Sequence, residues 1–288
     1  MNEIDPIFEF EVINIKLQTE KKNLNKLEAY KRIVLDLVKL KCHSAVGENK
    51  HLIIYSATPK ITDDEVEYIY GRIGKGIYFS DEKGSALDIE NSITEAEKFD
   101  TKKIYNPNIT DYVFIPAAHR LCVRLGDKIS GNDVRKFLIS NAKFVVDKKD
   151  KIEIVIEKEE TAIKELLTAK KVHKIDYSIS YTNDDTLGAS ASLFDRRLKK
   201  SQIGKLHLKA EADHNDYMEI KGEEILEGGI ELAKSNGNIN SADITTITGV
   251  RKTISSKDKP KKLKIKSDYE VFRKAVVSAI MLMFRSEL

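Results

Sequence analysis

The sequence contains no tryptophan, five prolines, two cysteines and no long apolar run. A membrane-spanning helix needs about 20 mostly apolar residues, so we expect no membrane partner. Cys42 and Cys122 lie far apart and outside any metal-ligand spacing, which favours reduced structural thiols in a cytoplasmic protein. The first residues, Met-Asn-Glu-Ile-Asp-Pro, lack the basic and then apolar order of a signal peptide.

Neither sign of charge dominates. The 288 residues include 49 Lys and Arg against 46 Asp and Glu, a net charge of +3. A hydrophobic fraction of 41% and a charged fraction of 33% are typical of a globular protein with a real core. The length suits one large domain or two ordinary ones. Because the net charge is small, only a local basic cluster would indicate nucleic-acid binding.

The segment Lys151–Ala212 has the clearest pattern, and we predict strand, helix, strand, helix and strand along it. Ile152, Ile154 and Ile156 alternate with charged residues, as in a half-buried strand. Apolar residues of the two predicted helices lie at the spacing of one buried stripe. The predicted elements are the strands 151–157, 172–181 and 204–210 and the helices 160–170 and 189–199.

The first half predicts a strand at 6–18, a helix at 24–41 and strands at 52–55 and 66–79. The segment Gly71–Gly76 is rich in glycine and basic residues, but it lacks the spacing of a phosphate-binding loop. We therefore favour a twisted hairpin there. Residues 112–125 predict two strands joined at a corner that would expose His119 and Arg120, either as an ordinary loop or as an anion site.

These elements predict an α+β protein of two lobes, with mixed or antiparallel sheets. The N-terminal lobe spans residues 1–115 and the C-terminal lobe residues 116–288. The second lobe would contain a ferredoxin-like β-α-β-α-β core within Leu121–Ala210. A final helix, Asp268–Arg285, is apolar on nearly every side, so we expect it to be buried in the core or against a second subunit in a homodimer.

The strongest local cluster of charge lies at 251–266, with one acidic residue, Asp258. Leu263 and Ile265 alternate with lysines there, which predicts an edge strand with a basic outer face. Such a face binds phosphates through counterion release without reading the sequence, but a solvated edge strand has the same pattern. The candidate nucleic-acid-binding residues are Arg251, Lys252, Lys257, Lys259, Lys261, Lys262, Lys264 and Lys266, with help from Arg196 and Arg197.

A metal-dependent nuclease is the alternative. Asp213, Glu219 and Lys221 resemble an Asp and Glu-x-Lys arrangement in which two carboxylates hold Mg²⁺. Their short separation also fits acidic residues at the start of a helix. Asn183-Asp184-Asp185 suits either a turn and helix cap or a metal ligand. Outside this alternative we expect no catalytic residue, metal or cofactor.

Six segments carry a resemblance to a known family: Ile104–Asn108, Tyr112–Leu121, Glu160–Leu167, Ile175–Asp185, the helix with Phe194 and Arg197-Leu198, and Ala233–Ile239. In these segments the chain resembles an uncharacterised bacterial family, number 4747 in the domain-of-unknown-function series. The general layout is also similar to that of the phage exclusion protein RexA, a dimeric DNA-binding sensor of abortive infection. The resemblance implies a bacterial, cytoplasmic, anti-phage setting and supplies no catalytic residues.

We therefore expect a non-enzymatic, dimeric component of an anti-phage system that binds DNA or RNA. A subunit that senses a phage protein, or that joins a partner subunit of a defence operon, is a third hypothesis. It predicts neither binding nor cleavage of nucleic acid.

Overall fold

A computed structural model describes most of the chain, and its class is α+β, as predicted. The described residues are 6–18, 25–88, 93–126, 128–159, 161–180, 189–213, 216–222, 224–256, 259–268 and 271–286. Within them no helix is long and apolar enough to cross a membrane. The predicted turn Asn183–Asp185 and the candidate Lys257 lie outside this part of the chain.

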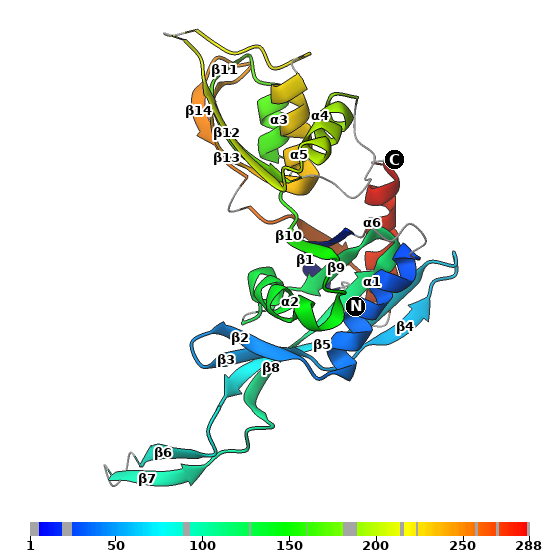
Figure 1. Ribbon diagram of the computed structural model, residues 1–288, viewed down its shortest axis with the longest axis vertical. Coiled ribbons are helices and arrows are strands. Elements are labelled where there is room, and N and C mark those ends of the chain that lie inside the picture. Colours follow the sequence, from blue (N-terminus) through cyan, green and yellow to red (C-terminus); the bar gives the residue numbers. More distant parts are fainter. Residues whose placement is uncertain are drawn as a thin grey trace, which may run out of the picture.

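Nine antiparallel strands form the larger sheet (Figure 1). Its main order is β10-β1-β9-β8-β5-β3-β2, while β15 also pairs with β1 and β4 with β5. The strands are β1 (Ile7–Gln18), β2 (His43–Gly47), β3 (Lys50–Ile54), β4 (Thr58–Ile61), β5 (Glu67–Tyr78), β8 (Ile104–Ile115), β9 (Arg120–Arg124), β10 (Lys151–Ile156) and β15 (Lys262–Lys266). The short 3₁₀ turn η1 (Pro116–Ala118) joins β8 to β9.

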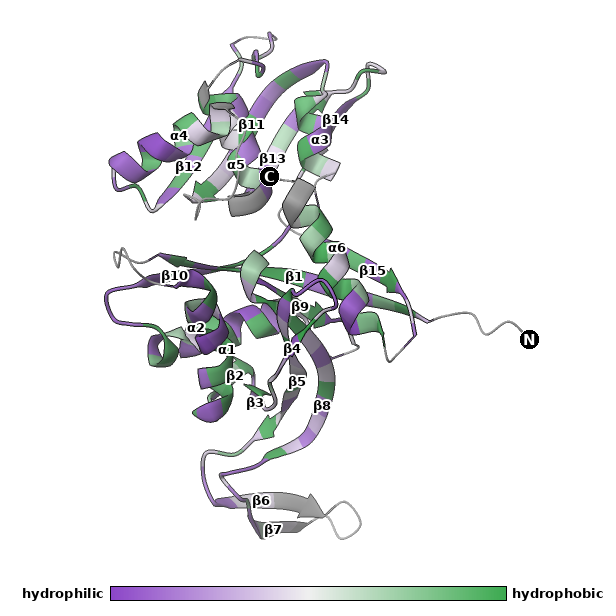
Figure 2. Cartoon of the chain, turned by 90° about the vertical axis from the view of Figure 1, so that its right-hand side faces the viewer, coloured by the Kyte–Doolittle hydropathy of each residue, from purple (hydrophilic) through white to green (hydrophobic). Residues whose placement is uncertain are grey.

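Both faces of the larger sheet are covered, because β1 contributes apolar side chains to each. Ile13 and Ile15 pack with α1 (Lys26–Lys39) and α2 (Gly131–Val145) on one face. Phe10 and Val12 pack with α6 (Phe272–Ser286) on the other. The hydropathy colouring of Figure 2 shows these elements against the sheet. Phe272, Val276, Val277 and Ile280 of α6 are buried, which confirms its predicted place in the core.

The smaller sheet has the order β12-β11-β13-β14 and carries its helices on one face (Figure 1). Ile175, Tyr177 and Ile179 point into the core beneath these helices. The strands are β11 (Lys171–Ser180), β12 (Lys205–Glu211), β13 (Gly237–Thr245) and β14 (Arg251–Ile254). The helices are α3 (Thr161–Leu167), α4 (Ala189–Lys200) and α5 (Gly229–Asn236), with a π-helical turn η2 (Glu224–Gly228) before α5.

The predicted sheet over Lys151–Ala212 is wrong, because its first strand belongs elsewhere. β10 pairs with β1 in the larger sheet, whereas β11 pairs with β12 and β13 in the smaller one. The apolar face of β10 is needed to cover the α2 side of the larger core. The β9 strand also pairs with β1 and β8, so the ferredoxin-like order within Leu121–Ala210 does not form. The predicted boundary after residue 115 falls at the turn between the paired strands β8 and β9.

Two antiparallel connections join the sheets. One follows β10 and the other precedes β15, and Lys158 bridges to Pro260 where they cross. The amide N–H of Glu159 donates to the carbonyl of Lys259, and that of Lys261 donates to the carbonyl of Glu157. The chain therefore passes twice between the sheets through one short ladder.

Close backbone approach explains the glycines of β5. A Cβ at Gly71 would overlap the carbonyl oxygen of Ser56, and one at Gly76 would overlap the carbonyl oxygen of Tyr105. Both glycines lie within one continuous strand, so the predicted hairpin at Gly71–Gly76 is wrong. They therefore admit neighbouring backbone into the sheet and are not part of a phosphate-binding loop.

Candidate nucleic-acid interface

The strand β15 presents a row of lysines on its exposed face. Lys262, Lys264 and Lys266 are exposed, whereas Ile265 between them is 8% exposed and packs in the core with α6. Alternate residues of a strand point the same way and lie about 7 Å apart. The local alternation of charge and apolarity therefore builds an evenly spaced line of ammonium groups. We call Lys262, Lys264 and Lys266 the lysine row.

Two carboxylate residues of β1 lie opposite the lysine row, Glu9 opposite Lys264 and Glu11 opposite Lys262, and Glu11 accepts a hydrogen bond from the amide of Gly131. Glu9 of β1 is 3.2 Å from the Nζ atom of Lys264 and 3.7 Å from that of Lys262. The side chain of Lys264 stays 66% exposed and that of Lys262 44% exposed. Exposed pairs of this kind contribute only about 0–1 kcal/mol. The lysines can therefore exchange Glu9 for another anion at small cost.

The predicted edge strand at Leu263 and Ile265 is β15, which pairs with β1. The basic run 251–266 is not one strand, because Pro260 and its neighbours form the connection between the sheets. Arg251 and Lys252 lie on β14 of the smaller sheet, while the lysine row lies on β15 of the larger one. Lys252 pairs with Glu165 at 3.1 Å. Lys259 is exposed in the connection. The basic run of the sequence is thus divided between two sheets.

Lys261 differs from the lysines of the row, because its side chain is only 19% exposed. Its Nζ atom lies 3.7 Å from Glu157, and the same carboxylate accepts a hydrogen bond of 2.7 Å from Nε of Arg120. Both partners of that second pair are at most 10% exposed. Lys261 therefore contributes to an internal ion-pair cluster with Arg120 and Glu157.

The expected exposure of His119 and Arg120 is wrong, since they are 7% and 5% exposed. The ring of His119 stacks on Tyr30, and its Nδ1 atom lies 2.9 Å from Oδ1 of Asn14. Arg120 donates to Glu157 and to the carbonyl of Ala118. These partners compensate the burial of polar groups. The corner is therefore structural and offers no open anion site.

A second buried cation lies where the sheets meet. Lys16 has no exposed surface, and its Nζ atom is 3.8 Å from Glu153. Ser180, at the end of β11 in the smaller sheet, donates to both carboxylate oxygens of Glu153 at 2.7 and 2.8 Å. This chain of contacts ties the two sheets together by polar interactions.

Arg196 and Arg197 are exposed near the C-terminal end of α4, as are Lys199 and Lys200. Lys199 pairs with the buried Asp195 at 2.8 Å. Cations at the end of a helix interact favourably with its dipole. The two arginines thus form a basic group on the smaller sheet's helical layer, separate in the fold from the lysine row.

The nuclease candidates do not lie on adjoining strands. Asp213 follows β12, whereas Glu219 and Lys221 follow the bridge between Met218 and Val172. All three side chains are exposed. In the ranges that the structure describes, no group of three or more His, Cys, Asp or Glu side chains is placed to hold a metal ion. The geometry therefore gives the Mg²⁺ alternative no support.

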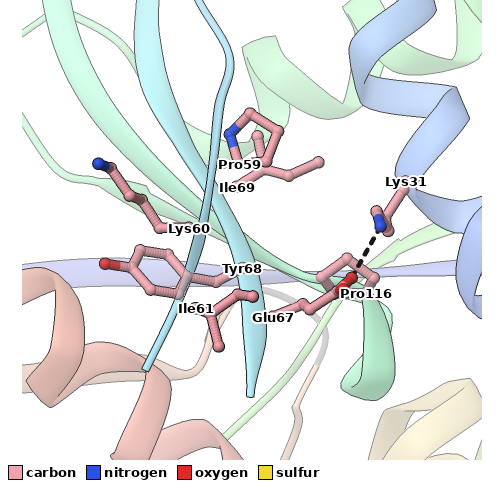
Figure 3. Close-up of a pocket in the computed structure, with 8 residues that line it drawn as sticks. All are labelled: Lys31, Pro59, Lys60, Ile61, Glu67, Tyr68, Ile69 and Pro116. Carbon is pink, nitrogen blue, oxygen red and sulfur yellow. Dashed lines mark ion pairs between the residues drawn. The ribbon is translucent and has the colours of Figure 1, made fainter. Parts of the chain in front are cut away.

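Two hollows in the surface each contain a carboxylate beside their cations. One has a volume of about 160 Å³ and a mostly apolar lining. In it Lys31 pairs with Glu67 at 2.8 Å (Figure 3). Another of about 520 Å³ lies at the junction of the sheets and includes Arg135 and Lys158. There Glu11 accepts a hydrogen bond of 2.6 Å from the amide of Gly131, at the start of α2. An internal carboxylate thus occupies a helix end that would otherwise attract an anion.

One polar cluster was not predicted. On the smaller sheet, Nε2 of His207 lies 2.7 Å from Oδ1 of Asp176, which also accepts a hydrogen bond of 2.6 Å from Asn240. The hydrogen bonds from Asn240 and His207 lower the pKa of Asp176. The three residues come from β12, β11 and β13. Asp176 and His207 each alternate with apolar residues along their own strands, which indicates outward-facing side chains. Only the order of the strands in the sheet brings the three side chains together.

The fold and this geometry define an α+β protein with two larger antiparallel sheets, a third sheet of only two strands, and an exposed row of lysines. The chain belongs to the family described as a domain of unknown function (DUF4747), whose model matches residues 7–282. No curated protein matches its sequence.

Proposed function

We propose that this chain binds nucleic acid through the lysine row without cleaving it. The observation that carries the proposal is the geometry of β15, where Ile265 is buried and the flanking lysines point outward. A line of cations about 7 Å apart suits a polymer that carries one negative charge per nucleotide. Lysine contacts to phosphate give affinity without sequence readout.

The exposed Arg196 and Arg197 of α4 and Arg251 of β14 are secondary contacts in this proposal. Because they belong to the smaller sheet, a strand of nucleic acid that reached them would have to span both sheets. Their removal should therefore weaken only long ligands. Lys261 is not a phosphate contact in this account, because its side chain is only 19% exposed and is directed to Glu157.

Fluorescence anisotropy with labelled single-stranded and double-stranded DNA and RNA tests the proposal. The variant Lys262→Gln, Lys264→Gln, Lys266→Gln removes the row's charge without placing new acids beside Glu9. The matched control, Lys39→Gln, Lys41→Gln, Lys50→Gln, removes the same charge from exposed positions around the β2–β3 edge. We expect the row variant to lose binding and the control to keep most of it.

Three results would change this conclusion. Equal affinity of the row variant and the wild type would remove the lysine row as the site. Shortened nucleic acid that appears only with Mg²⁺ and is lost in Glu219→Ala would favour the nuclease alternative. If the protein bound no nucleic acid at moderate salt, a role as a protein-interaction subunit would be favoured.

We further propose that the binding serves a bacterial anti-phage system. The reason for proposing this setting is the resemblance of the layout predicted from the sequence to that of an abortive-infection sensor. Plaque counts on cells with and without the gene test it, with the row variant as the matched comparison. Protection that depends on Lys262, Lys264 and Lys266 is expected, whereas equal plaque counts in all three strains would contradict it.

A further inference from the structure

A β-hairpin arm extends from the larger sheet. Its strands β6 (Lys83–Asp88) and β7 (Ile93–Lys98) pair only with each other, as a separate two-stranded sheet. Figure 1 shows the arm projecting from the end of the molecule opposite the smaller sheet. A lone two-stranded hairpin is marginally stable in water, and its outer edges leave backbone groups unpaired. An arm of this kind gains stability when it binds a partner.

Aromatic contacts fix the arm at its base. The rings of Phe79 and Phe99 stack with centroids 3.7 Å apart, and Tyr105 meets Phe79 edge-on at 5.5 Å. The hydroxyl of Tyr105 accepts a hydrogen bond of 2.7 Å from the amide of Asp100. A Cβ at Gly84 would overlap the ring of Phe99, so glycine lets this ring lie against β6. The arm is therefore held in one direction before any partner binds.

The arm is acidic and the rest of the chain is basic. Residues 81–100 contain seven Asp and Glu and two Lys, so the other residues contain 47 Lys and Arg against 39 Asp and Glu. Asp81, Glu82 and Glu97 are exposed. The small net charge of the whole chain thus conceals two regions of opposite sign. The acidic arm of one copy is therefore attracted electrostatically to the basic surface of another copy.

We propose that the arm binds the basic surface of a second copy of this chain, with the lysine row as its main contact. The acidic charge of the arm repels phosphates, so nucleic acid is the poorer occupant of the arm itself. The arm of a second copy and nucleic acid would then compete for the lysine row. Only this competition rests on the proposed function, since the association needs no nucleic acid.

A charge swap, read by sedimentation velocity in low and high salt without nucleic acid, tests the contact. The arm variant is Asp81→Lys, Glu82→Lys, Glu97→Lys. The charge-reversed row variant, different from the glutamine variant above, is Lys262→Glu, Lys264→Glu, Lys266→Glu. We expect the wild type to associate in low salt and to dissociate as salt is added. Each variant alone should associate more than about 100-fold more weakly, because like charges then face each other.

Mixing the two variants should restore association, because the new acids of one face the new lysines of the other. A control, Glu48→Lys, Asp64→Lys, Glu65→Lys, makes the same charge change at exposed positions outside the arm and should associate like the wild type. Circular dichroism checks that each variant folds. A monomeric wild type in low salt, an arm variant that still associates, or a mixture that stays monomeric would overturn the proposal. If the wild type associated as expected but did not bind nucleic acid, only the proposed function would be contradicted.

Discussion

Replacing Glu157 with glutamine should destabilise the protein strongly, because its carboxylate lies between two cations at the junction of the sheets. Arg120 lies 2.7 Å from one oxygen and Lys261 3.7 Å from the other, with side chains 6% and 19% exposed. Breaking a buried ion pair by removing one partner costs about 3–5 kcal/mol. Glutamine keeps an acceptor for Arg120, so we expect the lower end, about 3 kcal/mol.

Urea denaturation followed by circular dichroism measures this loss. The matched control is Glu9→Gln, which removes a carboxylate that is 35% exposed beside Lys262 and Lys264. Exposed pairs contribute about 0–1 kcal/mol, so the control should unfold near the wild-type midpoint. If Glu157→Gln and Glu9→Gln had the same effect, the buried cluster would not stabilise the junction and the reasoning would be refuted.

Three further predictions concern the core. Burial raises the pKa of Tyr177 to about 12; because the unfolded side chain ionises near pH 10, stability present below pH 10 should fall by about 3 kcal/mol as the pH rises through 12. Urea midpoints measured from pH 9 to 12 should show this fall, and Tyr177→Phe should remove it. Gly71→Ala should cost about 1–3 kcal/mol by overpacking against Ser56, whereas Gly47→Ala has open space and should melt within a few degrees of the wild type. Burial raises the pKa of Cys122, so Ellman's reagent should modify this thiol only after denaturation; rapid reaction in the native protein would contradict its placement.

Local patterns predicted most elements, because each depends on nearby residues. The alternation in β1 and the apolar stripe of α1 are visible in the sequence, and so is the start of α2, where Ser130 and Asp133 form a capping box. The sheet to which a strand belongs depends on distant partners. β10 and β11 have the same alternation, yet only the fit of Ile154 into the larger core places β10 beside β1.

The lysine row was predicted because its pattern is local, whereas the contacts of the other candidate residues depend on distant partners. Alternation with Leu263 and Ile265 correctly indicated that Lys262, Lys264 and Lys266 point outward. Pro260 was a usable signal that the basic run is not one strand, since proline interrupts a sheet's ladder. No local signal predicted the burial of Arg120, because its partner Glu157 is 37 residues away.

The salt dependence of binding tests the central claim most directly. Each phosphate that a lysine neutralises contributes about 0.9 to the slope of log affinity against log salt for duplex DNA. Anisotropy titrations from low to moderate salt should therefore give a slope smaller by about 2.7 in the Lys262→Gln, Lys264→Gln, Lys266→Gln variant than in the wild type. The Lys39→Gln, Lys41→Gln, Lys50→Gln control should keep the wild-type slope. Equal slopes in the row variant and the wild type would show that the lysine row does not contact phosphate.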